Sequence, residues 1–443
     1  SSTGVVTINA IPDYEAKSSY SINVAASDGT LTSTKAVTVS VADVAPAITS
    51  STSVSVPEGT ATSTVVYTAS ATDPAGGTVT YSLTGADAGA FTINTSTGAV
   101  TFNASPDFET KSSYSFDVRA SDPSGAFNTQ AVVVSVSDVA PTISSSTSAS
   151  VAEGTSTSTV VYTASATDPA GGTVTYSLTG ADAGAFTIDT STGAVTFNVS
   201  PDFETKSSYS FNVKASDPSG AFNTQAVTVS VTDVAPTISS GAAGSVTEGA
   251  AAGTTVYTAA ASDVSGGTVN YSLSGADAGS FSINSSTGVV TINAIPDYET
   301  KPSYSIDVVA SDGTLSSTQA VTVSVADAAP AISSGAAGGV TEGAAAGTTV
   351  YTAAASDVAG GTVSYSLSGT DAGSFTIDVS TGVVTINAIP DYEAKSSYSI
   401  DVVASDGTLS STQAVTVSVT DVAPVIGSGA AGSVAEGAAA GTT

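Results

Sequence analysis

The sequence contains no cysteine, histidine, tryptophan or methionine. Without cysteine there is no disulfide, zinc–thiolate site or thiol nucleophile, and the redox compartment cannot be inferred from cysteine usage. Without histidine, the commonest general base in enzymes is missing. Because residue 1 is not methionine, we expect the chain to be a window of a longer protein, whose signal peptide would lie outside it.

Positive charge is also scarce. Lysine and arginine total 8 against 38 aspartates and glutamates, which gives a net charge of −30. Such a surface makes nucleic acid and anionic membranes poor partners, so we expect no nucleic-acid partner, and it favours cations. No stretch approaches the roughly 20 apolar residues needed to span a bilayer, so we expect no membrane insertion in this segment. Hydrophobic residues still make up 41%, which is enough for folded cores.

One block of residues recurs along the chain. An Asp-(Val/Ala)-Ala-Pro motif recurs at spacings of 95, 95, 94 and 94 residues, and its aspartates are Asp43, Asp138, Asp233, Asp327 and Asp421. A period of this length predicts an array of small domains, each with its own core. The predicted boundaries are 1–46 (the C-terminal part of a repeat), 47–141, 142–236, 237–330, 331–424 and 425–443 (the start of a further repeat).

Within residues 142–236, short runs rich in Val, Thr, Tyr and Phe alternate with polar residues, and no helical periodicity intrudes. The predicted inward residues are Val160, Tyr162, Ala164, Ala166, Val174, Tyr176, Leu178, Phe186, Ile188, Val195, Phe197, Tyr209, Phe211, Val213, Ala215, Val227, Val229 and Val231. The turn from Asp189 to Gly193 predicts a hairpin with glycine at a positive φ.

With the segment Ser148–Ala152, these runs give about seven strands. The predicted fold is all-β: a tandem array of seven-stranded antiparallel Greek-key sandwiches of the immunoglobulin-like kind. The linkers are short and contain proline, so the array is expected to form an extended rod with semi-rigid joints.

Acidic residues follow one order in every repeat. The segments that carry this order in residues 142–236 are Val151-Ala152-Glu153-Gly154, Ala166-Thr167-Asp168-Pro169, Phe186-Thr187-Ile188-Asp189 with Thr192-Gly193, Pro201-Asp202-Phe203-Glu204 before Tyr209, Val213-Lys214-Ala215-Ser216-Asp217 and Val231-Thr232-Asp233. Through these motifs the chain resembles the cadherin domain, in the cadherin-like form common in bacterial surface proteins.

The resemblance implies calcium at the junctions between repeats. The upper repeat would supply the early Glu, the Asp-x-Glu pair and the linker Asp, and the lower repeat its loop Asp and the Asp of Ala-x-Asp. The implied ligands of the truncated first junction are Asp13, Glu15, Asp43, Asp73 and Asp122. Those of the second are Glu58, Asp107, Glu109, Asp138, Asp168 and Asp217. Those of the third are Glu153, Asp202, Glu204, Asp233, Asp263 and Asp312. Those of the fourth are Glu248, Asp297, Glu299, Asp327, Asp357 and Asp406, and the last repeat offers Glu342, Asp391, Glu393 and Asp421.

This grouping also has a physical rationale. Six converging carboxylates repel one another without a cation, and Ca²⁺ takes about six to eight oxygen ligands in a flexible geometry. Mg²⁺ is the weaker candidate because it needs a tighter octahedron and keeps its waters. The second Asp of the family's Asp-x-Asp loop is Ala75, Ala170, Ser265 and Ala359 here, and the linker has lost its Asn and second Asp. We therefore expect one or two Ca²⁺ ions per junction.

Other charged residues have simpler interpretations. Asp87, Asp182 and Asp277 of Gly-Ala-Asp-Ala-Gly, and the hairpin residues Asp189 and Asp378, are interpreted as turn formers. The lysines that follow the Asp-x-Glu pair by two residues (Lys111, Lys206 and Lys395) are interpreted as exposed neighbours of little energetic weight.

Three functions compete. The favoured one is a non-catalytic, extracellular, calcium-stiffened stalk of a long bacterial cell-surface adhesin or fibre, involved in cell adhesion. The alternative is a structural subunit that assembles with neighbouring copies of the same chain into an extracellular filament. An enzymatic function, with Asp202 and Glu204 as a glycosidase-like pair, is disfavoured because these residues are two apart and no cleft is evident. Calcium-dependent joints would require a calcium-rich compartment, outside the cell.

Overall fold

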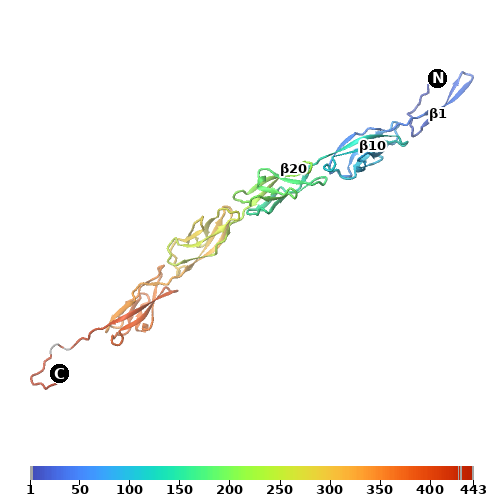
Figure 1. The fold of residues 1–443 in the computed structure, drawn as a ribbon. Coiled ribbons are helices and arrows are strands. Elements are labelled where there is room, and N and C mark those ends of the chain that lie inside the picture. Colours follow the sequence, from blue (N-terminus) through green and yellow to red (C-terminus); the bar gives the residue numbers. More distant parts are fainter. Residues whose placement is uncertain (1–2, 428, 430–431, 442–443) are drawn as a thin grey trace. The chain divides into compact units, whose positions relative to one another are not determined.

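The computed structural model describes residues 3–427, 429 and 432–441. The chain divides into two compact units, Ser1–Asp233 and Val234–Thr443, and each is described by itself. The first unit opens with an antiparallel hairpin, β1 (Ser19–Ser27) and β2 (Thr32–Ser40). Figure 1 shows two sandwiches in this unit, one around β10 (Ser113–Ser121) and one around β20 (Phe222–Thr232).

Residues 142–236 illustrate the architecture of one repeat. The elements are β12 (Thr142–Ile143), β13 (Ser148–Ala152), β14 (Val160–Thr163), β15 (Ala166–Thr167), β16 (Thr175–Thr179), the 3-10 helix η2 (Ala183–Ala185), β17 (Phe186–Ile188), β18 (Ala194–Phe197), β19 (Ser208–Ser216) and β20. One sheet has the strand order β13-β20-β19-β16 and the other β14-β18-β17, while β12 pairs with β15. The prediction of an all-β sandwich is confirmed. The pairing departs from a purely antiparallel pattern because β13 runs parallel to β20.

The core follows from the alternation in the sequence. In β20 every second residue from Val227 to Val231 is buried, and Phe211, Val213 and Ala215 of β19 are buried beside them. The other sheet contributes buried Val195 and Phe197. Apolar faces of both sheets therefore meet in one core per repeat, which is the arrangement that removes most apolar surface from water.

One predicted core position is wrong. Val160 was expected to face inward, but it is 51% exposed. The register between β14 and β18 shifts between Val160 and Tyr162, so the strand contains an irregularity of the bulge type. An extra residue at such a position reverses the side on which the preceding side chain lies. Val161 is half-buried instead.

The hairpin between β17 and β18 was predicted from its turn residues, and this is confirmed. Gly193 has a φ of +72°. Asp189 Oδ1 accepts the backbone N–H groups of Ser191 and Thr192 at 2.9 and 2.8 Å. Together with the Ser191 hydroxyl, these donors hold the pKa of Asp189 well below its usual range.

The other repeats have the same plan. Residues 47–141 contain β3 (Ala47–Ile48), β4 (Ser53–Pro57), β5 (Val65–Thr68), β6 (Ala71–Thr72), β7 (Thr80–Thr84), η1 (Ala88–Ala90), β8 (Phe91–Ile93), β9 (Ala99–Phe102), β10 and β11 (Phe127–Ser137). Residues 237–330 contain β21 (Thr237–Ile238), β22 (Ala243–Thr247), β23 (Thr255–Thr258), β24 (Ala261–Ser262), β25 (Asn270–Ser274), η3 (Ala278–Ser280), β26 (Phe281–Ile283), β27 (Val289–Ile292), β28 (Ser303–Ser311) and β29 (Ser316–Ala326). Residues 331–424 contain β30 (Ala331–Ile332), β31 (Ala337–Thr341), β32 (Thr349–Thr352), β33 (Ala355–Ser356), β34 (Ser364–Ser368), η4 (Ala372–Ser374), β35 (Phe375–Ile377), β36 (Val383–Ile386), β37 (Ser397–Ser405) and β38 (Ser410–Thr420).

The cores differ between two kinds of repeat. In residues 47–141, Phe91, Phe102, Tyr114 and Phe116 form a cluster of edge and tilted ring contacts. In residues 237–330 the same place has only the Phe281–Tyr304 ring pair beside buried isoleucines. The same backbone fold is therefore packed with an aromatic core in one kind of repeat and with a more aliphatic core in the other. No helix among the described residues is long and apolar enough to cross a membrane.

Candidate metal centre

The early glutamate is a buried anchor. Glu58 directly follows β4 and is only 3% exposed. Its Oε2 accepts the backbone N–H of Phe108 at 3.0 Å, and its Oε1 accepts that of Val139 at 2.8 Å. One side chain therefore ties the Asp-Phe-Glu turn and the linker to the end of β4. Glu248 and Glu342 make the same pair of bonds in their own repeats.

The two acids of the Asp-Phe-Glu turn have different roles. Asp107 accepts the Thr110 backbone N–H at 3.0 Å and the Thr110 hydroxyl at 2.7 Å. These donors, the hydroxyl foremost, lower the pKa of Asp107. Glu109, in contrast, has two buried carboxylate oxygens without a hydrogen-bond partner. Asp107 thus shapes the turn, and Glu109 projects an unsatisfied carboxylate.

Glu109 lies in two groups of three carboxylates. One group is Glu58, Glu109 and Asp168, and the other is Glu109, Asp138 and Asp217. In each group one oxygen per residue lies within 4.8 Å of the others. Burial, followed by repulsion from Glu58, raises the pKa of Glu109 to about 7. The first unit therefore brings acids of residues 47–141 and 142–236 together around one shared side chain.

The acids of the lower repeat are held by their own loops. Asp168 Oδ1 accepts the Ala170 N–H at 2.8 Å, and Asp217 Oδ1 accepts the N–H groups of Gly220 and Ala221 at 2.8 and 2.9 Å. In both residues the second oxygen, Oδ2, is buried and has no hydrogen-bond partner. Each carboxylate is therefore oriented by one oxygen and leaves the other available.

A hydroxyl group joins the linker to the lower repeat. The Ser219 hydroxyl lies within hydrogen-bond distance of both Asp138 Oδ2 and Asp217 Oδ1, the latter at 2.8 Å. Since a hydroxyl has one proton, it donates to only one of them at a time. The sequence analysis missed this residue. A signal was present, because the longer loop Ser216–Asn223 and the shorter loop Ser405–Ser411 both place Ser or Thr two residues after the loop Asp, at Ser219 and Thr408.

The truncated first junction has part of this arrangement. Glu15, Asp73 and Asp122 form a group within 4.8 Å, and Ser124 donates to Asp43. Asp13 accepts the Ala16 N–H at 2.9 Å and so has the turn-shaping role of Asp107.

In the second unit, Glu299 is the counterpart of Glu109. Burial, followed by repulsion from Glu248 and then Asp327 and Asp357, raises its pKa. Asp357 and Asp406 each have one buried oxygen without a hydrogen-bond partner, and Thr408 donates to Asp327. Asp297 is occupied by Thr300, as Asp107 is by Thr110.

For two of the predicted ligand sets, the structure brings together only some of the residues or leaves most of them exposed. Glu153, Asp202 and Glu204 form a group within 4.8 Å, and burial followed by repulsion from Glu153 raises the pKa of Glu204 to about 7. Their assembly with Asp233, Asp263 and Asp312 stays a prediction, because Asp263 and Asp312 belong to the second unit. In the last repeat, Asp391, Glu393 and Asp421 are exposed, and Glu342 is half-buried.

The donor set fits calcium. The buried oxygens without a hydrogen-bond partner include those of Glu15, Glu109, Asp122, Asp138, Asp168, Asp217, Asp263, Asp312, Asp327, Asp357 and Asp406. All of these residues are acids predicted as ligands. Two like charges repel by about 4 kcal/mol at a separation of about 4 Å and an effective dielectric constant of about 20. A hard divalent cation with oxygen ligands would remove this repulsion and satisfy the buried oxygens.

Comparison with known proteins agrees with the fold and with the predicted repeats. The family model of the cadherin domain matches residues 52–137, 147–232, 242–326 and 337–420. Human protocadherin Fat 1 is 32% identical over 430 residues, which covers 89% of this chain and 9% of Fat 1. Human protocadherin-16 is 32% identical over 378 residues, covering 78% of this chain and 11% of that protein. The chain thus spans about a tenth of the length of these curated relatives.

Among solved structures, mouse cadherin-23 EC22-24 is 26% identical, with 64% of this chain and 100% of that chain covered. Its TM-score is 0.27, which is too low to carry an argument. The family model and the identities above are sufficient, however: this chain belongs to the cadherin family, as a tandem array of cadherin domains.

The family defines the class of protein. Cadherin domains generally bind Ca²⁺ at the junctions between domains, and the ectodomains of related cadherins are extracellular. Family members are non-enzymatic adhesion proteins. The glycosidase-like hypothesis also lacks geometric support, because both oxygens of Asp202 accept hydrogen bonds from Thr205.

Proposed function

We propose that this chain is a calcium-rigidified, non-catalytic stalk segment of a long extracellular adhesin or fibre. The observation that carries the proposal is the group of carboxylates around Glu109, drawn from consecutive repeats and left with buried oxygens without a hydrogen-bond partner. The boundaries 1–46, 47–141, 142–236, 237–330, 331–424 and 425–443 are proposed as the mechanical units.

The ligands are proposed junction by junction as in the sequence analysis. Around Glu109, Glu58 and Asp168 would hold one ion, and Asp138 and Asp217 a second. Ala170 stands where a further Asp ligand occurs in the family motif. This supports one or two ions per junction. In this scheme, Asp107 contributes mainly by shaping the turn.

Stiffness follows from the origin of the ligands. Without a cation, acids of two consecutive repeats repel and favour separation of the repeats. A shared Ca²⁺ would link these acids, so the joint would lose its freedom to bend. A stalk built in this way holds a terminal binding domain at a distance from the cell surface. A bacterial surface is the setting that the sequence motifs suggested, and it stays part of this proposal.

The test is a calcium titration of the full chain. Small-angle X-ray scattering and thermal unfolding would be recorded in chelator and at rising Ca²⁺ up to millimolar concentrations. We expect a higher melting temperature and a larger, narrower distribution of overall dimensions with calcium. Unchanged dimensions and an unchanged melting temperature would refute the stalk mechanism. Mg²⁺ at the same concentrations serves as the control and should be less effective.

A second candidate is a subunit that self-assembles into an extracellular filament. It is favoured by the near-identity of the repeats, which offers the same surface many times, and by the homophilic partners common among cadherins. Sedimentation velocity at several protein concentrations, with and without Ca²⁺, separates the two. A sedimentation coefficient that increases with protein concentration supports the filament, and a single monomeric species argues for the stalk.

A further inference from the structure

The glycine after the early glutamate touches the next repeat. Gly249 follows Glu248 and has a φ of +73°. A Cβ atom at this position would lie 2.6 and 2.8 Å from the two methyl carbons of Val358. Gly59 has the same relation to Pro169: an added Cβ would lie 2.8 Å from Pro169 Cβ and 2.9 Å from its carbonyl oxygen. In both pairs the partner directly follows the loop aspartate.

The contact is separate from the need for a positive φ. Gly343 occupies the equivalent position in residues 331–424 and has a φ of +75°. Nothing lies within 4 Å of a Cβ atom added there. The left-handed backbone is therefore a property of the turn itself. The close approach at Gly249 depends on the neighbouring repeat.

A second set of contacts ties the linker to the lower repeat of the same junction. The Thr408 hydroxyl donates to Asp327, and the Ser411 hydroxyl donates to the carbonyl oxygen of Pro330. In the first unit, the Ser219 hydroxyl lies within hydrogen-bond distance of Asp138, and Asn223 Nδ2 donates to the Pro141 carbonyl oxygen at 2.9 Å. These bonds run from the loop of one repeat to the linker before it, and the two that end on proline carbonyl oxygens involve no predicted metal ligand.

We propose that consecutive repeats seat on each other through this metal-independent contact, with the glycine as its determining residue. Glu248 and Asp357 are the chain neighbours of Gly249 and Val358. The packing of the glycine against Val358 therefore sets how close the two halves of the acidic group come. The seating precedes cation binding and presets the geometry of the site, which makes Gly249 a positioning residue.

The test measures one junction within the whole 443-residue chain. Since the chain has no cysteine, Ser272→Cys and Ser366→Cys provide two unique spin-label sites. Both serines are exposed and lie on strands of the two repeats, β25 and β34. Pulsed electron paramagnetic resonance in chelator would then report the distribution of distances across this junction. The variants compared are Gly249→Ala, Val358→Ala, the double variant and Gly343→Ala.

We expect Gly249→Ala to broaden the distribution in chelator, because overpacking a close contact shifts such an equilibrium by about tenfold. Val358→Ala removes the two methyl carbons nearest to the new Cβ and leaves only Val358 Cβ, at 3.1 Å, so the double variant should recover a narrow distribution. Gly343→Ala alone and Val358→Ala alone should each leave the distance distribution narrow in chelator. If Gly249 acted only within its own turn, Val358→Ala in the next repeat would not rescue Gly249→Ala.

Calcium provides an independent arm. In Gly249→Ala, the Ca²⁺ concentration that narrows the distribution should rise about tenfold, and it should return to the wild-type value in the double variant. A distribution that ignores Ca²⁺ in every variant would count against calcium binding, while the chelator data still test the seating. The seating proposal is overturned if Gly249→Ala leaves the distribution narrow, or if Val358→Ala fails to rescue it.

Discussion

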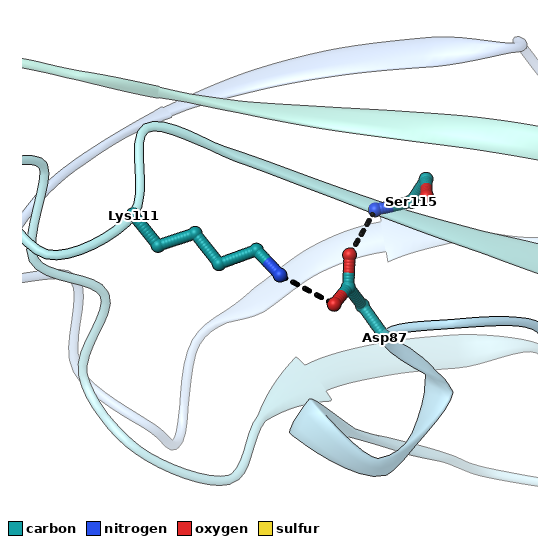
Figure 2. Close-up of polar contacts among 3 residues, drawn as sticks. All are labelled: Asp87, Lys111 and Ser115. Atoms are coloured by element: carbon teal, nitrogen blue, oxygen red, sulfur yellow. Dashed lines mark hydrogen bonds and ion pairs between the residues drawn. The ribbon is translucent and has the colours of Figure 1, made fainter.

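The ammonium group of Lys111 forms an ion pair with Asp87, 24 residues earlier in the chain (Figure 2). The second carboxylate oxygen of Asp87 accepts the Ser115 N–H at 2.8 Å, and Lys111 also lies 4.8 Å from the centre of the Tyr114 ring. The same ion pair recurs as Lys206–Asp182, Lys301–Asp277 and Lys395–Asp371. The sequence analysis interpreted Asp87 as a turn former and Lys111 as an exposed neighbour, and the Lys111 side chain is indeed 41% exposed; it did not include the pairing of these two side chains. The pair fastens the turn that carries Glu109 to the start of η1.

This pair predicts an acid-sensitive contact. The hydrogen bond from Lys206, followed by that from the Ser210 N–H, lowers the pKa of Asp182 below its usual value of 3.8. A carboxylate whose pKa is lowered by folding stabilises the protein at pH values above its unfolded pKa. This contribution is lost as the pH falls through the folded pKa. We expect Lys206→Met to weaken protection of β19 at pH 6, measured by hydrogen exchange, with the difference shrinking below about pH 4.

Lys35→Met is the matched control, since Lys35 is exposed and forms no ion pair with any described residue. It should leave the protection of β19 unchanged at both pH values. Equal protection in Lys206→Met and the unsubstituted chain at pH 6 would show that the ion pair has no structural weight.

The shared glutamate predicts the opposite pH dependence. The pKa of Glu109 is raised from 4.5 to about 7, chiefly by burial. A raised pKa means that the protonated carboxyl of Glu109 stabilises the fold. This contribution to stability is complete below the unfolded pKa and is lost as the pH rises through the folded pKa. In chelator, the melting temperature of residues 47–233 within the full chain should therefore fall between pH 4.5 and about pH 7. Millimolar Ca²⁺ should flatten this fall.

Glu109→Gln removes the titrating carboxyl and should reduce the fall in chelator, as measured by differential scanning calorimetry. Asp189→Asn is a matched control, because asparagine occupies the equivalent hairpin positions Asn94 and Asn284. A fall of the same size in Glu109→Gln and in Asp189→Asn would contradict the assignment to Glu109.

The loss of calcium affinity on removing a ligand should increase with the number of carboxylate groups to which that residue belongs. Glu109 belongs to the group with Glu58 and Asp168 and also to the group with Asp138 and Asp217, whereas Asp168 shares only the first of these. We expect Glu109→Gln to weaken calcium binding at this junction by about tenfold or more, and Asp168→Asn by less, because affinity follows the number of charged ligands. Isothermal titration calorimetry on the full chain measures both the ion count and the affinity. Asp189→Asn should change neither, and a greater loss for Asp168→Asn would reverse the assigned roles.

Core packing gives a test of stability without reference to metal. Phe211 is 1% exposed, and Phe222 in the same repeat is 50% exposed. Phe211→Ala should lower the free energy of unfolding of residues 142–236 by about 3–5 kcal/mol, because it removes a buried ring and leaves a cavity. Phe222→Ala should cost far less. Urea unfolding followed by hydrogen exchange mass spectrometry localises the effect, and equal costs would contradict the assigned core.

Several features could be predicted because they depend on local pattern. Alternating residues such as Val227 and Val229 fix the buried face of a strand, since side chains of a strand alternate with period two. The Asp189 turn needs only its own residues and a glycine. Val160 was misplaced because a bulge depends on how two strands pair, which one strand's pattern does not contain.

The acidic sites were predictable for another reason. The order of Glu58, Glu109 and Asp138 resembles a motif of the cadherin domain, so the resemblance gave candidates before any geometry was known. It could not separate Asp107, whose oxygens are taken by Thr110, from Glu109, whose oxygens have no hydrogen-bond partner. It also missed the Ser219 hydroxyl and the lysine–aspartate pair, because their partners are distant in sequence.

The sequence by itself determined the period of the array, the all-β class, the surplus of negative charge and the choice of oxygen as the only ligand chemistry. These properties follow from composition and local periodicity, which need no knowledge of distant contacts. The tertiary structure alone decided which oxygen of each acid is left without a hydrogen-bond partner, which acids share a group with Glu109, and that Gly249 meets Val358. Each of these depends on where separate loops end after the sandwiches have formed, because packing brings together residues that are far apart in the chain.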